Sequence, residues 1–173
     1  MVATGGKWLA NDINTLITLT LNRPLVRLIQ QAAQSIATTT DTALTFGAGS
    51  EDIDTHGFHD TSTNNTRITP TVAGYYQLYG VVWWGNADNI TSYHAGIGKN
   101  GSVAARQRTL MPATLLPAAT TRSINAAAIL SANGTTDYFE LFGQQNRATP
   151  ASLSTNVGGT FSSMFECMYL RPL

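Results

Sequence analysis

Apolar and polar residues alternate in short runs along the chain from Thr38 onward, and turn residues separate the runs at intervals of about ten. A period of two is typical of strands, because successive side chains of a strand point to opposite faces. The runs are rich in β-branched and aromatic residues, which favour strands. The pattern predicts an all-β fold, an antiparallel β-sandwich, over residues 38–173.

The strongest run is "AGYYQLYGVVWWG", residues 73–85, and it is apolar on both faces. Its even positions form one face: Tyr76, Leu78, Val82 and Trp84. Its odd positions form the other: Tyr75, Tyr79, Val81 and Trp83. In a monomeric antiparallel sandwich one face of each strand meets water and is polar. We therefore expect the odd-numbered face to lie against another subunit, since a row of exposed aromatic side chains promotes aggregation.

Two Asn-Gly pairs and the C-terminal run complete the strand pattern. Asn100-Gly101 and Asn133-Gly134 each predict a tight hairpin, because both residues tolerate the positive φ that a type I′ turn requires. The final run, residues 161–170, predicts a closing strand with two apolar faces.

Residues 1–37 follow a different pattern. Leu25, Leu28, Ile29, Ala32 and Ala33 recur with the spacing of one helix face, which predicts a short amphipathic helix. The residues upstream fit either a helix or an extended arm, because threonines weaken the helical propensity. We expect the segment to anchor the protein to a larger assembly through its apolar side chains: Trp8, Leu9, Ile13, Leu16, Leu25, Leu28 and Ile29.

Composition narrows the range of functions. A chain of 173 residues is most simply one domain, preceded here by an arm. Ten basic residues balance ten acidic residues without a basic run, so we expect no nucleic-acid partner. No window reaches the roughly 20 apolar residues that a membrane span requires, and no cleaved signal is recognisable. The single cysteine, Cys167, excludes an internal disulfide.

The stretch "EDIDTHGFHDTSTNN", residues 51–65, gathers the densest set of metal-ligating side chains. The candidate ligands are Asp52, Asp54, His56, His59 and Asp60. Because the stretch lies between two predicted strands, we favour a solvated, hydrogen-bonded loop, with a divalent-metal site such as one for calcium as the alternative. We expect no cofactor and no catalytic site here.

Other residues carry weaker signals for chemistry. No nucleophile elbow, phosphate-binding loop or zinc-protease motif occurs in the sequence, so we expect no enzyme. Cys167 is expected to be a buried, inert thiol, and Glu140 and Glu166 would need a shared cleft before they suggested glycoside chemistry. Trp83, Trp84 and Tyr93 fit either sugar stacking or a core, and residues 106–122 fit either a packed crossover or a binding loop.

The serial order of four motifs resembles the complement globular head and tumour necrosis factor superfamily. The motifs are "TRITPTVAGYYQLYGVVWW", "AGIGKNGS", "AAAILSANGTTDYFELF" and "FSSMFECMYL". They place Pro70 and Gly74 before the aromatic strand, Lys99-Asn100-Gly101 in a turn, and Asp137 after a second turn. The resemblance covers residues 38–173 and departs from the family in lacking a collagen-like stalk.

The resemblance implies a jelly roll that assembles as a homotrimer. The trimer would bury the face that carries Tyr75, Tyr79, Val81 and Trp83 near a threefold axis. The layout, an arm over residues 1–37 and a head over 38–173, is similar to bacteriophage virion proteins of the minor-tail, fibre or capsid-decoration kind. It implies a structural protein of the virion whose partners are itself and a capsid or tail protein. The alternative is a lectin-like head that recognises a host cell-surface glycan.

Overall fold

The protein is described here by a computed structural model over residues 22–112, 122–158 and 161–173. These residues form twelve strands and one short 3-10 turn, η1. In chain order they are β1 (Leu25–Ile29), β2 (Ser35–Ile36), β3 (Thr42–Ala43), β4 (Glu51–Asp54), β5 (Arg67–Ile68), β6 (Gly74–Trp84), β7 (Ile90–Lys99), η1 (Ala105–Gln107), β8 (Arg108–Pro112), β9 (Arg122–Ala132), β10 (Phe139–Arg147), β11 (Leu153–Ser154) and β12 (Met164–Arg171).

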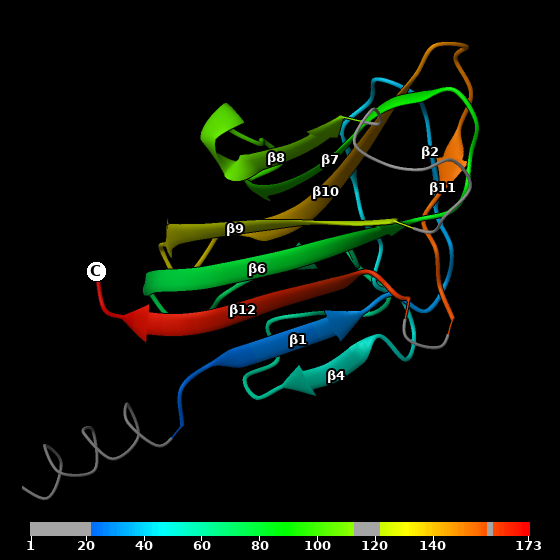
Figure 1. Cartoon of the computed structure of the whole chain (residues 1–173). Helices are drawn as coiled ribbons and strands as arrows, with labels where there is room; N and C mark the ends of the chain where they lie inside the picture. Colours follow the sequence, from blue (N-terminus) through cyan, green and yellow to red (C-terminus); the bar gives the residue numbers. More distant parts are fainter. Residues whose placement is uncertain (1–21, 113–121, 159–160) are drawn as a thin grey trace, which may run out of the picture.

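The strands form two main sheets that pack face to face (Figure 1). Sheet I has the order β4-β1-β12-β6-β9, and sheet II has the order β3-β10-β7-β8, with β5 also paired to β10. A small third sheet joins β11 to β2 at one end. All of these strand pairs are antiparallel. The predicted fold class, an antiparallel β-sandwich jelly roll, is confirmed.

The core lies between the two sheets and is built by alternation. The even positions of β6 are buried in it, with Tyr76, Leu78, Val82 and Trp84 each inaccessible to solvent. Phe139 and Leu141 of β10 and Ile97 of β7 meet them from sheet II. The predicted division of β6 into two faces is therefore confirmed. Burial of each large side chain contributes roughly 1.5–3 kcal/mol, so the even-numbered face is a main source of stability.

The predicted helix over residues 25–33 is wrong, because Leu25–Ile29 forms strand β1. β1 pairs with β12 on one side and β4 on the other. Val26 and Leu28 alternate into the core, and this pairing outweighs the helical spacing of the apolar residues. β1 and β2 also precede residue 38, so the sandwich begins inside the segment assigned to the arm.

The anchor residues divide accordingly. Leu28 is fully buried inside its own chain and is not available to dock on another protein, which corrects its assignment as an anchor. Leu25 and Ile29 lie on the opposite face of β1 and are half-buried. Trp8, Leu9, Ile13 and Leu16 lie outside the described residues.

One of the two predicted hairpin turns is confirmed. Asn100 and Gly101 have φ angles of 54° and 78°, and Lys99 and Ser102 exchange backbone hydrogen bonds across them. At Asn133-Gly134 the prediction of a hairpin is wrong, because β9 belongs to sheet I and β10 to sheet II. The chain crosses there between the sheets, and only Gly134 of the pair has a positive φ, 75°.

Asp137 secures this crossing. Its carboxylate accepts hydrogen bonds of 2.8 Å from Asn100 Nδ2 and 2.9 Å from the backbone N–H of Asn133. It also pairs with Lys99 Nζ at 2.8 Å. The hydrogen bond from Asn100, followed by that from Lys99, lowers the pKa of Asp137 below its usual value. The acid that follows the second turn thus ties both turns together.

Within the described residues, no helix has the length and apolar character needed to cross a membrane.

Candidate functional site

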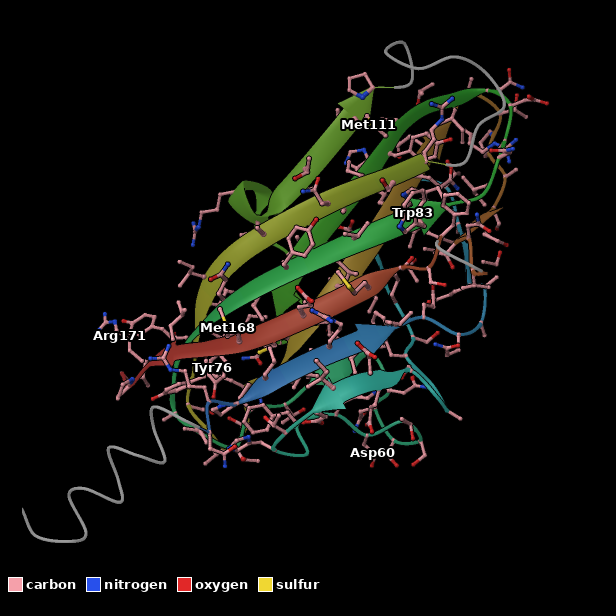
Figure 2. All side chains as sticks on the ribbon, turned by 60° about the horizontal axis from the view of Figure 1, so that its bottom comes forward. Asp60, Tyr76, Trp83, Met111, Met168 and Arg171 are labelled. Carbon is pink, nitrogen blue, oxygen red and sulfur yellow. The ribbon has the colours of Figure 1, made fainter. Side chains whose placement is uncertain are left out.

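The candidate functional site is the face of sheet I that points away from sheet II, here called the open face. Figure 2 turns it toward the viewer, with Trp83 near one end of β6 and Met168 and Arg171 near the other. Alternation places the odd positions of β6 on it, since the even positions fill the core. Pairing sets further side chains beside them in rows that cross the sheet. The rows are Leu25, Met168, Gln77 and Ile129; Arg27, Glu166, Tyr79 and Ala127; and Ile29, Met164, Val81 and Asn125.

Large apolar side chains remain exposed on the open face. The exposed fraction is 65% for Ile129, 45% for Phe161 and 39% for Met168. Phe161 packs edge-on against Trp83, with ring centroids 5.0 Å apart. Tyr75, Tyr79, Val81 and Trp83, the predicted subunit contacts, are only partly covered by their own chain. An apolar surface of this kind marks an interaction site more often than a solvated face.

A charged cluster lies in the middle row of the open face. Arg27 of β1 stands directly opposite Glu166 of β12, and its Nε donates to Glu166 Oε1 at 2.5 Å. Its Nη1 lies 3.4 Å from Asp52 Oδ2 of β4. The hydrogen bond and charge of Glu166 raise the pKa of Arg27 above its usual value. This cluster could not be predicted from the sequence, because Arg27 and Glu166 are 139 residues apart.

The outer face of sheet II differs, because the chain covers it over β7 and β10. Ser92, His94, Glu140 and Phe142 point outward between the core positions of β7 and β10, yet each is at most 8% exposed. A Cβ added to Gly96 would lie 2.7 Å from Val103 Cγ1, so the segment after the Asn100-Gly101 turn runs close across this face.

The predicted metal-ligand cluster does not converge. Asp52 pairs with Arg27, whereas Asp54 accepts backbone N–H bonds from His56 and His59. Asp60 accepts from the backbone N–H groups of Ser62 and Thr63, which lower its pKa to about 2. Within the described residues, no three His, Cys, Asp or Glu side chains are grouped to hold a metal ion.

The two histidines of this stretch are engaged locally. His56 Nδ1 lies 2.8 Å from the hydroxyl of Thr55. Both ring nitrogens of His59 lie 2.8 Å from backbone carbonyl oxygens, those of Arg67 and Phe46. Because its two ring nitrogens face carbonyl groups from two other segments, His59 ties three chain segments together. The favoured interpretation, a hydrogen-bonded loop, agrees with these contacts for residues 55–65, but it is wrong for Glu51–Asp54, which forms the edge strand β4.

The remaining candidates are separated from one another. Cys167 is buried in the core, and burial raises the pKa of its thiol, as expected for an inert cysteine. Glu140 and Glu166 point outward from opposite sheets and share no cleft. Trp84 and Tyr93 are buried, so the idea that they stack on sugars is wrong. Of residues 106–122, Arg108–Pro112 forms strand β8 beside β7, and 113–121 lie outside the described residues.

A polar hollow lies beside the end of β1. Its volume is about 320 Å³, and it is lined by Ile29, Gln30, Gln31, Val157, Gly158 and Ser162. The backbone N–H of Phe161 donates to the carbonyl of Gly158, so Phe161 is hydrogen-bonded to a residue that lines the hollow.

Comparison with known proteins places the fold. No protein-family model matches the chain, and no curated protein does. Solved structures with similar folds include murine APRIL at pH 5.0, with 10% sequence identity, a TM-score of 0.59, and coverage of 85% of this chain and 99% of that one. Eiger TNF from S. frugiperda is similar at 11% identity and a TM-score of 0.60, with coverage of 87% and 94%. The chain therefore has a jelly roll of the tumour necrosis factor type.

Proposed function

We propose that the protein is a structural subunit of a bacteriophage particle, a homotrimeric jelly-roll knob of the minor-tail, fibre or capsid-decoration kind. The protein is located in the virion, and its partners are two further copies of itself and a capsid or tail protein. The trimer forms through the open face. The observation that carries the proposal is the second apolar face of β6, which the chain leaves partly exposed.

Several features support self-association over binding to an unlike protein. The formal net charge is zero, so copies do not repel one another strongly at neutral pH. The open face carries Tyr, Trp and Met side chains, which are enriched at the centres of protein interfaces. The fold is shared with APRIL and Eiger TNF, and the family resemblance implies trimers.

Attachment to the particle is assigned to the residues before β1. Trp8, Leu9, Ile13 and Leu16 supply apolar side chains there, and this layout of arm and head is the support for the phage context. Leu25 and Ile29 belong instead with the open face.

The test of this proposal separates the arm from the head. Deletion of residues 1–21, which retains β1, is expected to leave a soluble trimer that no longer joins the particle. Incorporation would be measured by purifying particles from cells that supply either the full chain or the truncated chain. A truncated protein that still incorporates at the normal level would contradict the role of the arm.

A second candidate function, a lectin-like head for host surface glycan, is favoured by one observation. Phe161, which is 45% exposed, precedes Ser162 in the chain, and Ser162 lines the hollow together with Gln30 and Gln31. An aromatic ring next to amide and hydroxyl groups is a combination that suits a sugar. A glycan array would show binding that Phe161→Ala abolishes, and an array without any reproducible ligand would remove this candidate.

A further inference from the structure

We propose that the Arg27–Glu166–Asp52 cluster fixes the register in which copies of the chain assemble across the open face. The inference rests on the proposed trimer and adds the residues that make its geometry specific. The partner it requires is a second copy that presents a hydrogen-bond donor to the cluster.

The position of the cluster is the first argument. Along β1, Arg27 lies between Leu25 and Ile29, and along β12, Glu166 lies between Met164 and Met168. Across the sheet, Glu166 is followed by Tyr79. Apolar side chains therefore surround the ion pair on the open face, except on the side of the edge strand β4, where Asp52 lies next to Arg27.

Solvent exposure is the second argument. The side chains of Arg27 and Glu166 are still 41% and 25% exposed in the single chain. An exposed pair of this kind contributes little to the stability of the monomer. When a second copy covers the face, both groups lose water, and only a surface with matching polar groups compensates for that loss. A copy that shifts by one row places apolar side chains over the charges and is disfavoured.

Charge is the third argument. Two carboxylates surround one guanidinium, so the cluster has one formal negative charge in excess. Glu166 Oε1 and Asp52 Oδ2 both accept from Arg27, which leaves each carboxylate with a further oxygen able to accept. The complementary group is therefore a donor, and a positively charged one fits best.

The experiment compares four full-length chains by sedimentation equilibrium and native mass spectrometry: wild type, Arg27→Met, Glu166→Gln and the double variant Arg27→Met/Glu166→Leu. The single variant Arg27→Met leaves Glu166 covered without its partner, so the dissociation constant of the trimer should rise at least about 100-fold. Glu166→Gln keeps the side-chain shape and should weaken the trimer in the same direction by less.

The double variant tests register directly. It replaces the Arg27–Glu166 pair by apolar groups and leaves only Asp52, whose side chain is 45% exposed on the edge strand. Association should therefore return to within about tenfold of wild type, while species other than the trimer become populated. The matched control is Arg67→Met, which removes the arginine of the Arg67–Glu140 pair on sheet II. Thermal unfolding of each dilute chain reports any loss of folding, and the control should alter unfolding without altering association.

The outcomes separate the two proposals. A wild-type chain that stays monomeric overturns both the trimer and the register. A wild-type trimer with single variants that assemble equally well overturns the register alone. A double variant that forms only a uniform trimer, as tight as wild type, also overturns it, because the charges would then contribute no specificity.

Discussion

The outer faces of the two sheets differ in how far the chain itself covers them. On sheet II, Gly96 and Gly98 lack side chains, and residues 102–103 pass close over them: Ser102 O would lie 2.9 Å from a Cβ on Gly98. Over β7 and β10 that face is covered by its own chain, whereas Leu110 on the edge strand β8 is 54% exposed. On sheet I, Ile129 and Met168 stay exposed beside the aromatic positions of β6. The difference supports the proposal that other copies of the chain cover the open face of sheet I.

The largest effect is expected from the pair Tyr79→Ser and Trp83→Ser. Aromatic side chains at the centre of an interface typically contribute about 2–4 kcal/mol each to association, and a trimer contains three such contacts. Sedimentation velocity should show monomer or aggregate in place of trimer. Leu110→Ser, at a site 54% exposed on β8, is the matched control and should leave the trimer intact. An unchanged trimer in the double variant would contradict the role of the open face.

Trp84 and Trp83 are neighbours in β6, but Trp84 points into the core and Trp83 points to the open face. Substituting each in turn therefore compares the two faces of one strand. Trp84→Ala removes a fully buried side chain and should lower the free energy of unfolding by about 3–5 kcal/mol. This loss should persist at every protein concentration in urea titrations. Trp83→Ala should weaken stability mainly at concentrations where the trimer forms. Equal behaviour of the two variants across concentrations would remove the distinction between the faces.

Gly98→Ala tests the covered face. The added methyl would lie 2.6 Å from a ring carbon of Phe142 and close to the backbone of Ser102, so the overlying segment must shift. We expect a loss of about 1–3 kcal/mol in unfolding free energy, with no change in oligomeric state. Ala127→Ser, on the exposed side of β9, should scarcely alter the unfolding of the dilute chain. A neutral Gly98→Ala would show that the covering segment is loosely packed.

The smallest effect is a pH dependence at His94 on the covered face. Burial, followed by the charge of Arg108, lowers the pKa of His94 below its usual 6.5, while Asp41 opposes the shift. The neutral ring is therefore favoured in the folded chain. The stability it contributes is fully present above pH 6.5 and is lost as the pH falls through the lowered pKa.

His94→Gln should accordingly flatten the change in melting temperature between pH 7.5 and pH 5.5, as followed by circular dichroism. The effect should not depend on protein concentration, because the ring is covered by its own chain. A pH profile identical in wild type and variant would contradict this assignment.

Local alternation predicted the fold where a strand is regular, as in β6 and β12. It failed at β1, where Leu25, Leu28 and Ile29 fit a helix and a strand equally, and only pairing with β12 decides between them. The hairpin predicted at Asn133-Gly134 was also wrong, because an Asn-Gly pair does not reveal that the flanking strands lie in different sheets. The odd-numbered face of β6 was predictable from its own residues. The Arg27–Glu166 pair was not, because it exists only once distant strands become neighbours.

The central claim is that the open face is covered by other copies of the chain. The most direct measurement is the mass of the full-length protein in solution, by sedimentation equilibrium at micromolar concentration and neutral pH. We expect a single complex that contains three copies of the 18.5 kDa chain. A single species of 18.5 kDa across the whole concentration range would contradict it.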